Sequence, residues 1–192
     1  MKSLIRPAVS LFVLLTAVTG VLYPLAVTGV AKVAFPNQAA GSLVTKDGQA
    51  IGSSLVGQNF SDPKYFWGRP SATSPMAYNA ANSGGSNQGP TNPALVDAIK
   101  GRVDALKAAD PTNTADVPVD LVTASASGID PEISIAGARY QVARIAKARG
   151  VAPDVIEAQI SRHTVDRLFG LLGEPRVNVL ALNLDLEQSA SH

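Results

Sequence analysis

The residues with the most familiar catalytic spacing lie between Gly84 and Thr91, where Gly84 is followed five positions later by Gly89, Pro90 and Thr91. This spacing copies a phosphate-binding loop, in which backbone N–H groups and a lysine hold the phosphates. Pro90 stands at the lysine position, so both the ammonium group and one N–H donor are missing. No apolar strand precedes the segment. We therefore interpret it as a structural turn and not as a nucleotide site.

Other catalytic and metal-binding groups are sparse. The chain has no cysteine and only two histidines, His163 and His192, so a thiolate metal site is excluded and a zinc site is not indicated. The Gly-x-Ser-x-Gly, His-Glu-x-x-His and Asp-Lys-Thr-Gly sequences are absent as well. Ser161 and Asp166 beside His163 fit a solvated helix face. We expect an accessory protein with no catalytic residues, no metal and no directly bound cofactor.

Protein binding is the chemistry that residues 58–93 indicate. Half of the ten aromatic side chains and five of the thirteen prolines lie here, which excludes regular helix or long strand. Aromatic residues and arginine are enriched in binding hot spots, although aromatic rings dominate protein cores too. Arg69 and Asn87 fit a core less well, because unpaired burial of polar groups is costly. We predict a partner interface that contains Gln58, Phe60, Tyr65, Arg69, Asn79, Ser83, Gly84, Gly85, Asn87 and Asn92.

An apolar stretch from Pro7 to Ala31 precedes these residues, has no charged side chain, and is bounded by Arg6 and Lys32. At about 1.5 Å per helical residue it exceeds the hydrocarbon core of a bilayer, which is about 30 Å thick. A helix bonds every backbone group within the segment, as a membrane requires. A cleaved signal peptide ending near Gly29 is the alternative, but its apolar region would be shorter. We predict a single transmembrane helix.

The flanking charges predict the orientation of this helix. Lys2, Arg6 and the terminal amine precede it, whereas Lys32 alone lies close to its other end. The positive-inside rule therefore places the N-terminus in the cytoplasm and everything after Ala31 outside. The predicted division is an anchor over residues 1–34 and an extracytoplasmic domain over residues 35–192.

One face of the anchor is suited to contact with another helix. Small residues allow close backbone approach, and hydroxyl groups can bond across the contact. Four such residues share a stripe at helical spacing, and Pro24 permits a kink nearby. The predicted partner-helix face consists of Thr16, Thr19, Gly20 and Tyr23.

The remaining chain has the pattern of one mixed α+β domain. A small-residue link at 38–42, a hairpin over 43–51 around Asp47-Gly48 and a short strand at 54–57 are expected first. Asn92-Pro93 starts a helix that extends to about 109. A strand at 117–123, a helix from 131 to Gly150, a helix from 153 and an alternating strand over 176–187 follow. Residues 32–192 carry fourteen basic and fifteen acidic side chains, which gives no basic field for nucleic acid.

Four segments give the chain a resemblance to a known family. They span residues 57–72, 78–93, 123–134 and 172–183, and include Phe60-x-x-Pro63, Tyr65-Phe66, Gly128-Ile129-Asp130-Pro131 and Gly173-Glu174-Pro175-Arg176. In this order they resemble the C chain of the Kdp high-affinity potassium-transporting P-type ATPases. The resemblance covers nearly the whole sequence. Ile135 departs from the expected proline, at a helix start.

The resemblance implies a non-catalytic subunit of a complex for ATP-driven potassium uptake. The implied partners are a channel-like subunit that binds potassium, a P-type subunit that hydrolyses ATP and a small membrane peptide. The C chain of this family is described as an assembly subunit and as a catalytic chaperone that raises the ATP affinity of the pump. ATP and potassium would then be handled by the complex. A direct ATP-binding cofactor and a free periplasmic binding protein are the alternatives.

Overall fold

The computed structural model describes residues 2–189, with side chains from Leu4 onward. Its contacts divide the chain between Ile51 and Gly52 into two compact units.

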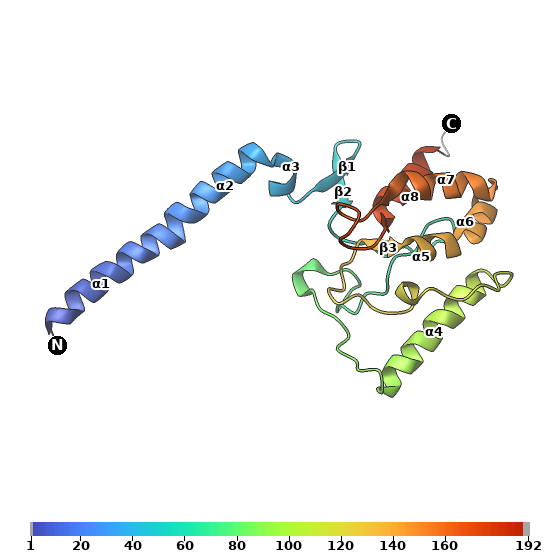
Figure 1. Cartoon of the computed structure of the whole chain (residues 1–192), viewed down its shortest axis with the longest axis horizontal. Coiled ribbons are helices and arrows are strands. Elements are labelled where there is room, and N and C mark those ends of the chain that lie inside the picture. Colours follow the sequence, from blue (N-terminus) through green and yellow to red (C-terminus); the bar gives the residue numbers. More distant parts are fainter. Residues whose placement is uncertain (1, 190–192) are drawn as a thin grey trace. The chain divides into compact units, whose positions relative to one another are not determined.

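A single long helix opens the first unit and forms the blue part of Figure 1. It consists of α1 (Lys2–Ala17), the π-helical turn η1 (Val18–Leu22) and α2 (Tyr23–Ala34). Pro24 has no N–H group, and its ring crowds the carbonyl four residues earlier. The helix is wider at this point, because the N–H of Tyr23 bonds the carbonyl of Val18, five residues earlier. The stretch Leu4–Ala34 is long and apolar enough to cross a membrane. The predicted apolar helix is confirmed.

The predicted hairpin is also confirmed. Strands β1 (Leu43–Lys46) and β2 (Gln49–Ser53) pair, and Asp47 and Gly48 both adopt positive φ, as a type I′ turn requires. The link expected at 38–42 is partly wrong, because α3 (Pro36–Ala39) occupies its start. Proline at the first helical position has a fixed φ that suits this short turn of helix.

A three-stranded antiparallel sheet lies at the centre of the second unit. Its order is β3 (Glu132–Ser134), β5 (Arg176–Asn178) and β4 (Thr164–Val165), with Ile133 opposite Val177. Four helices accompany it: α5 (Ile135–Tyr140), α6 (Val142–Arg149), α7 (Pro153–His163) and α8 (Val179–Ser189). Gly150 ends α6 with φ +69°, as the sequence predicts. The mixed α and β content is confirmed.

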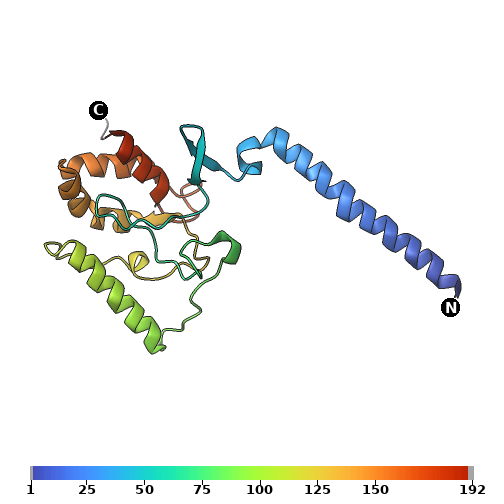
Figure 2. The same cartoon turned by 180° about the vertical axis from the view of Figure 1, so that it is seen from behind.

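The core of this unit joins the sheet to the helices. Phe66, Ile145, Val177 and Leu182 are fully buried in it, and Phe60 and Trp67 pack against it. Helix α4 (Pro93–Ala109) begins after Asn92, whose side chain accepts a hydrogen bond from the N–H of Ala94 as predicted. Figures 1 and 2 show α4 apart from α6, α7 and α8, with irregular chain between them. Residues 58–92 are irregular except for the turn η2 (Ala80–Asn82), which confirms that prediction.

Two short strands were predicted wrongly. The segment expected as a strand over 117–123 forms the 3-10 turn η3 (Val119–Leu121). The Thr123 hydroxyl donates to the carbonyl of Val119, and this local bond competes with strand formation. The segment 54–57 is a turn with one isolated bridge, between Ser53 and Val56.

Two further boundaries differ from the prediction. The helix expected from 131 starts at Ile135 after strand β3, because Ser134 is its N-cap and accepts from the N–H of Gly137. The strand expected over 176–187 is strand only to Asn178 and then continues as α8. The helix expected from 153 is α7, in which Ile156 and Ile160 are buried and Val155 is exposed.

Candidate functional site

Two buried amides attach the aromatic segment to the helices. Asn183 of α8 accepts a hydrogen bond from the N–H of Phe66 at 2.8 Å and donates to its carbonyl at 3.0 Å. Gln141, which follows α5, does the same for Trp67, at 2.8 Å and 3.1 Å. Each amide side chain therefore satisfies both the N–H and the carbonyl of one loop residue, as a neighbouring β-strand would. Residues 66 and 67 are fixed in the core by these bonds.

Two arginines on α6 complete the attachment. Arg144 is almost fully buried and donates to the carbonyls of Pro63 and Tyr65, to the latter at 3.1 Å. Its guanidinium also lies 4.2 Å from the ring centroid of Trp67. Arg149 donates to the carbonyl of Lys64 at 2.8 Å. Burial lowers the pKa of Arg144 to about 10, and the charges of Asp110 and Asp62 oppose that shift.

Arg69 lies at the edge of a recess of about 350 Å³. Its guanidinium contacts the carboxylate of Asp130 at 2.9 Å, and both side chains are about three-quarters buried. The hydroxyl of Tyr78 donates to the carbonyl of Arg69 at 2.5 Å. Burial raises the pKa of Tyr78 to about 12, the charge of Asp130 adds to the shift, and that of Arg69 opposes it. Gly57 is required here, since a Cβ would lie 2.4 Å from the Tyr78 ring.

The other charges around the recess also have internal partners. Glu132 and Arg176 pair across β3 and β5 at 2.7 Å. The carboxylate of Asp120 accepts from the N–H of Ser134 at 2.7 Å and from its hydroxyl at 3.1 Å. The residues that the structure describes contain no cluster of side chains able to hold a metal ion. The recess is therefore a polar surface whose charged side chains have partners within the chain, which suits contact with a protein. It unites three of the four segments that carried the family resemblance.

The residues predicted as a partner interface divide into two groups. Phe60 and Tyr65 contact each other with ring centroids 5.5 Å apart, and Phe60 packs against the core. Arg69 is paired with Asp130, and Asn79 and Asn92 cap η2 and α4. These five of the ten residues thus have a structural contact within the chain. Exposed members are Ser83, Asn87 and Asn92, while Gln58, Phe60, Tyr65, Arg69, Asn79, Gly84 and Gly85 are partly buried.

The predicted partner-helix face lies across the π-helical turn. The Thr19 hydroxyl donates to the carbonyl of Leu15 at 2.7 Å, which leaves its oxygen lone pairs for an outside donor. A Cβ on Gly20 would meet only the Thr16 methyl group, at 3.9 Å. The turn η1 adds a residue to the helical repeat, so it shifts Tyr23 away from a strict stripe with Thr16. Sequence spacing alone gave no signal of that turn.

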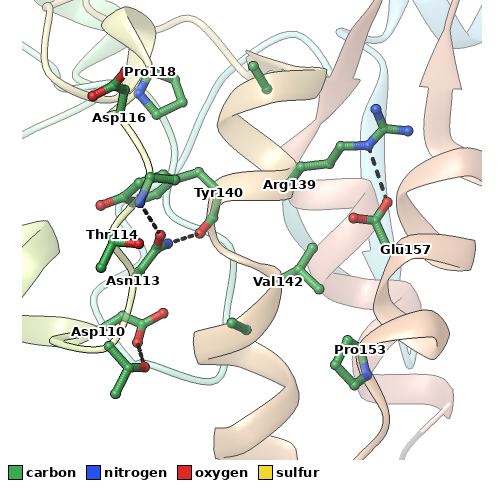
Figure 3. A pocket seen from close by; sticks show the side chains of 14 residues that line it. Asp110, Asn113, Thr114, Asp116, Pro118, Arg139, Tyr140, Val142, Pro153 and Glu157 are labelled. Atoms are coloured by element: carbon green, nitrogen blue, oxygen red, sulfur yellow. Dashed lines mark hydrogen bonds and ion pairs between the residues drawn. The ribbon is translucent and has the colours of Figure 1, made fainter.

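A larger pocket, of about 720 Å³, is lined by residues that no sequence motif singled out (Figure 3). Arg139 and Glu157 pair beside it at 3.3 Å, and the Asn113 amide donates to the carbonyl of Tyr140 at 2.9 Å. Within the described residues, Oδ2 of Asp110 and the hydroxyl of Tyr140 are buried without a hydrogen-bond partner. Both residues line the pocket, but these two atoms are shielded from water. Burial raises the pKa of Tyr140, and the charge of Asp110 raises it further.

The family of the chain follows from comparison over its whole length. The family model described as KdpC, the c chain of the K⁺-transporting ATPase, matches residues 5–188. The chain belongs to this family. It is 68% identical to the potassium-transporting ATPase KdpC subunit of Dechloromonas aromatica (strain RCB), over 97% of this chain and 98% of that protein.

Two further KdpC relatives agree with this assignment. The KdpC subunit of Variovorax paradoxus (strain S110) is 65% identical, with 100% of this chain and 99% of the relative covered. That of Herminiimonas arsenicoxydans is 64% identical, over 98% and 99%. The apolar helix and the mixed domain are therefore both parts of a KdpC chain.

Proposed function

We propose that this chain is a non-catalytic subunit of an ATP-driven potassium uptake complex of the bacterial inner membrane. The observation that carries the proposal is the match to KdpC subunits over 97% or more of the chain, apolar helix included. Its partners are then the channel-like potassium-binding subunit, the P-type subunit that hydrolyses ATP and the small membrane peptide. The chain itself supplies the anchor and a folded domain that contacts them.

The charges around the apolar helix support an outside location for the second unit. Arg6 and Lys2 lie at its N-terminal end, and Lys32 alone lies near its C-terminal end. With the N-terminus inside, one crossing by Leu4–Ala34 places residues 52–189 outside. In that position the unit can cover the potassium entrance but cannot contact cytoplasmic ATP.

Any effect on ATP affinity is then transmitted through the membrane subunits. Such an effect is a coupling free energy between distant sites, typically about 1–3 kcal/mol or roughly 5- to 150-fold in affinity. Residues 84–90, which have the spacing of a phosphate-binding loop, do not favour a direct route, because they lack a lysine and the N–H of Gly84 already bonds the carbonyl of Ser127 at 2.9 Å. A catalytic-chaperone role is therefore proposed as indirect.

The test compares the complex purified with this chain and without it. We expect potassium-stimulated ATP hydrolysis to be lost, or its KM for ATP to rise about tenfold, without the chain. Equilibrium binding of radiolabelled ATP to the full chain alone, in detergent, should give no saturable signal. Unchanged hydrolysis without the chain would refute the subunit role. Saturable ATP binding to the chain alone would instead support the direct cofactor.

A further inference from the structure

The loop between β4 and β5 has an exposed apolar tip, which we define as residues 168–172. Leu168, Phe169, Leu171 and Leu172 are 59%, 85%, 82% and 61% exposed. Single exposed apolar side chains are normal on a protein surface, but four in five consecutive residues form a patch that indicates an interaction site. This patch is separate from the predicted interface at 58–92.

The tip has a defined shape. The N–H of Leu168 bonds the carbonyl of Leu172 at 2.8 Å, and the N–H of Leu172 bonds the carbonyl of Leu168 at 3.0 Å. Phe169 adopts φ +55°, a left-handed conformation that is uncommon for a bulky residue. Gly170 follows with φ +72°. A tip held in one conformation loses little conformational entropy when it binds. More of the free energy gained by burying its apolar surface then contributes to affinity.

The charges at the base of the tip favour a protein over a lipid surface. Arg167 pairs with Glu174 at 2.6 Å, and Asp166 precedes Arg167, so residues 166–175 carry one basic and two acidic side chains. Lysine and arginine strengthen binding to a membrane interface because they attract anionic lipids. Here the flanking cation is already neutralised, and the exposed Glu174 carboxylate would be repelled by anionic headgroups. The complementary surface is therefore an uncharged apolar recess on a protein.

The position of the tip connects it to the candidate site. Gly173 and Glu174, which follow the tip directly, line the recess that contains Arg69, Asp130 and Arg176. An apolar centre beside paired polar groups is the usual arrangement of a protein interface. We propose that the tip inserts into an apolar recess on another subunit of the potassium-transporting ATPase. This inference rests on the proposed function and names the surface through which the subunit binds.

Photo-crosslinking in the assembled complex tests the contact. A photoreactive phenylalanine analogue replaces Phe169 in the full chain, and the same analogue replaces Val119, which is 72% exposed elsewhere on the second unit. After irradiation in membranes, we expect position 169 to give a product with the mass of this chain plus one other subunit, and position 119 to give none. A product of two copies of this chain, an adduct with lipid alone, or no product would each overturn the proposal.

A substitution measures the contribution of the tip. The double variant Phe169→Ser, Leu171→Ser removes its two most exposed side chains, so the melting temperature of the chain should stay unchanged. We expect at least about a tenfold loss in co-purification with the other subunits, as for a hot-spot pair. Val119→Ser is the matched control and should co-purify as wild type. Normal co-purification of the double variant would refute the tip while leaving the subunit role intact, because wild type would still assemble and support hydrolysis.

Discussion

At the scale of single residues, Tyr78 contacts three parts of the irregular chain around Arg69. Its hydroxyl donates to the carbonyl of Arg69, its N–H donates to the hydroxyl of Ser71, and its ring lies against the position that only glycine can occupy at 57. Tyr78 itself adopts φ +58°. Ionisation of the hydroxyl would break the bond to Arg69 and place a second negative charge near Asp130.

This arrangement predicts a stability change at alkaline pH. The pKa of Tyr78 is raised from 10.0 to about 12, so its contribution is fully present below pH 10 and is lost as pH rises through about 12. At pH 8, Tyr78→Phe should lower the unfolding free energy of the soluble fragment 36–192 by about 1 kcal/mol, the value of one hydrogen bond. Between pH 10 and 12 the gap between wild type and variant should shrink, as urea denaturation can measure. A gap that stays constant would contradict the raised pKa.

Arg144 shows what the sequence could not reveal at this scale. The run of Arg144, Lys147 and Arg149 near Gly150 indicates favourable interaction with the helix dipole. In the structure Arg144 is buried, and its guanidinium donates hydrogen bonds to two loop carbonyls and to the side chain of Gln141. The two loop residues lie about eighty positions away in the chain, so local pattern carries no information on these contacts. Conversely Asn92, whose capping bond is local, was predictable from Asn92-Pro93 alone.

At the scale of elements, α8 illustrates an ambiguous pattern. Leucine occupies every second position from Leu180 to Leu186, which matches a strand, but leucine and alanine are also strong helix formers. Two hydrogen bonds at its start, one local and one long-range, favour the helix. The side chain of Asn178 accepts from the N–H of Ala181 as an N-cap does, and the N–H of Val179 bonds the distant carbonyl of Pro131. Leu182, Asn183 and Leu186 are buried at helical spacing, which also favours the helix over a strand.

The π-helical turn of the anchor gives the prediction at this scale. Gly20→Leu should leave the helix intact, because the only atom near the new Cβ is a methyl group at 3.9 Å and leucine is a better helix former than glycine. If the face around Gly20 packs on a partner helix, the larger side chain separates the backbones. We expect reduced co-purification with the potassium-binding subunit.

The control for this prediction is Leu14→Val, an apolar replacement off the predicted face that should assemble normally. Circular dichroism of both variants checks that the helix is retained. If Gly20→Leu co-purifies as well as Leu14→Val, the face is directed toward lipid and the assignment of Thr16, Thr19, Gly20 and Tyr23 is incorrect.

At the scale of the whole molecule, a clear separation of composition made the long apolar helix predictable. A helical stretch of 31 residues, Leu4–Ala34, precedes a chain of mixed pattern, and the length of the apolar run favours an anchor over a core helix. The recess was not predictable in the same way. It needs Arg69 from the irregular loop, Asp130 before β3 and Arg176 in β5 to meet, and only the pairing of β3 with β5 brings the last two together.

The last prediction concerns the side of the membrane on which the second unit lies. The chain has no cysteine, so single cysteines can be placed without background in this subunit. Ala108→Cys on α4 and Ala158→Cys on α7 are exposed positions on different helices, so one bound partner is not expected to cover both. Leu4→Cys, at the N-terminal end of the apolar helix, is the control for the cytoplasmic side.

In intact cells, a membrane-impermeant maleimide should label Ala108→Cys and Ala158→Cys, and label Leu4→Cys only after lysis. The physical reason is that Lys2 and Arg6 hold the N-terminus inside and one crossing places the rest outside. Labelling is read from the mass of this subunit after purification. The opposite pattern, with positions 108 and 158 protected until lysis, would place the folded unit in the cytoplasm, where direct contact with ATP becomes possible. The proposal that the effect on ATP affinity is indirect is therefore decided by this measurement.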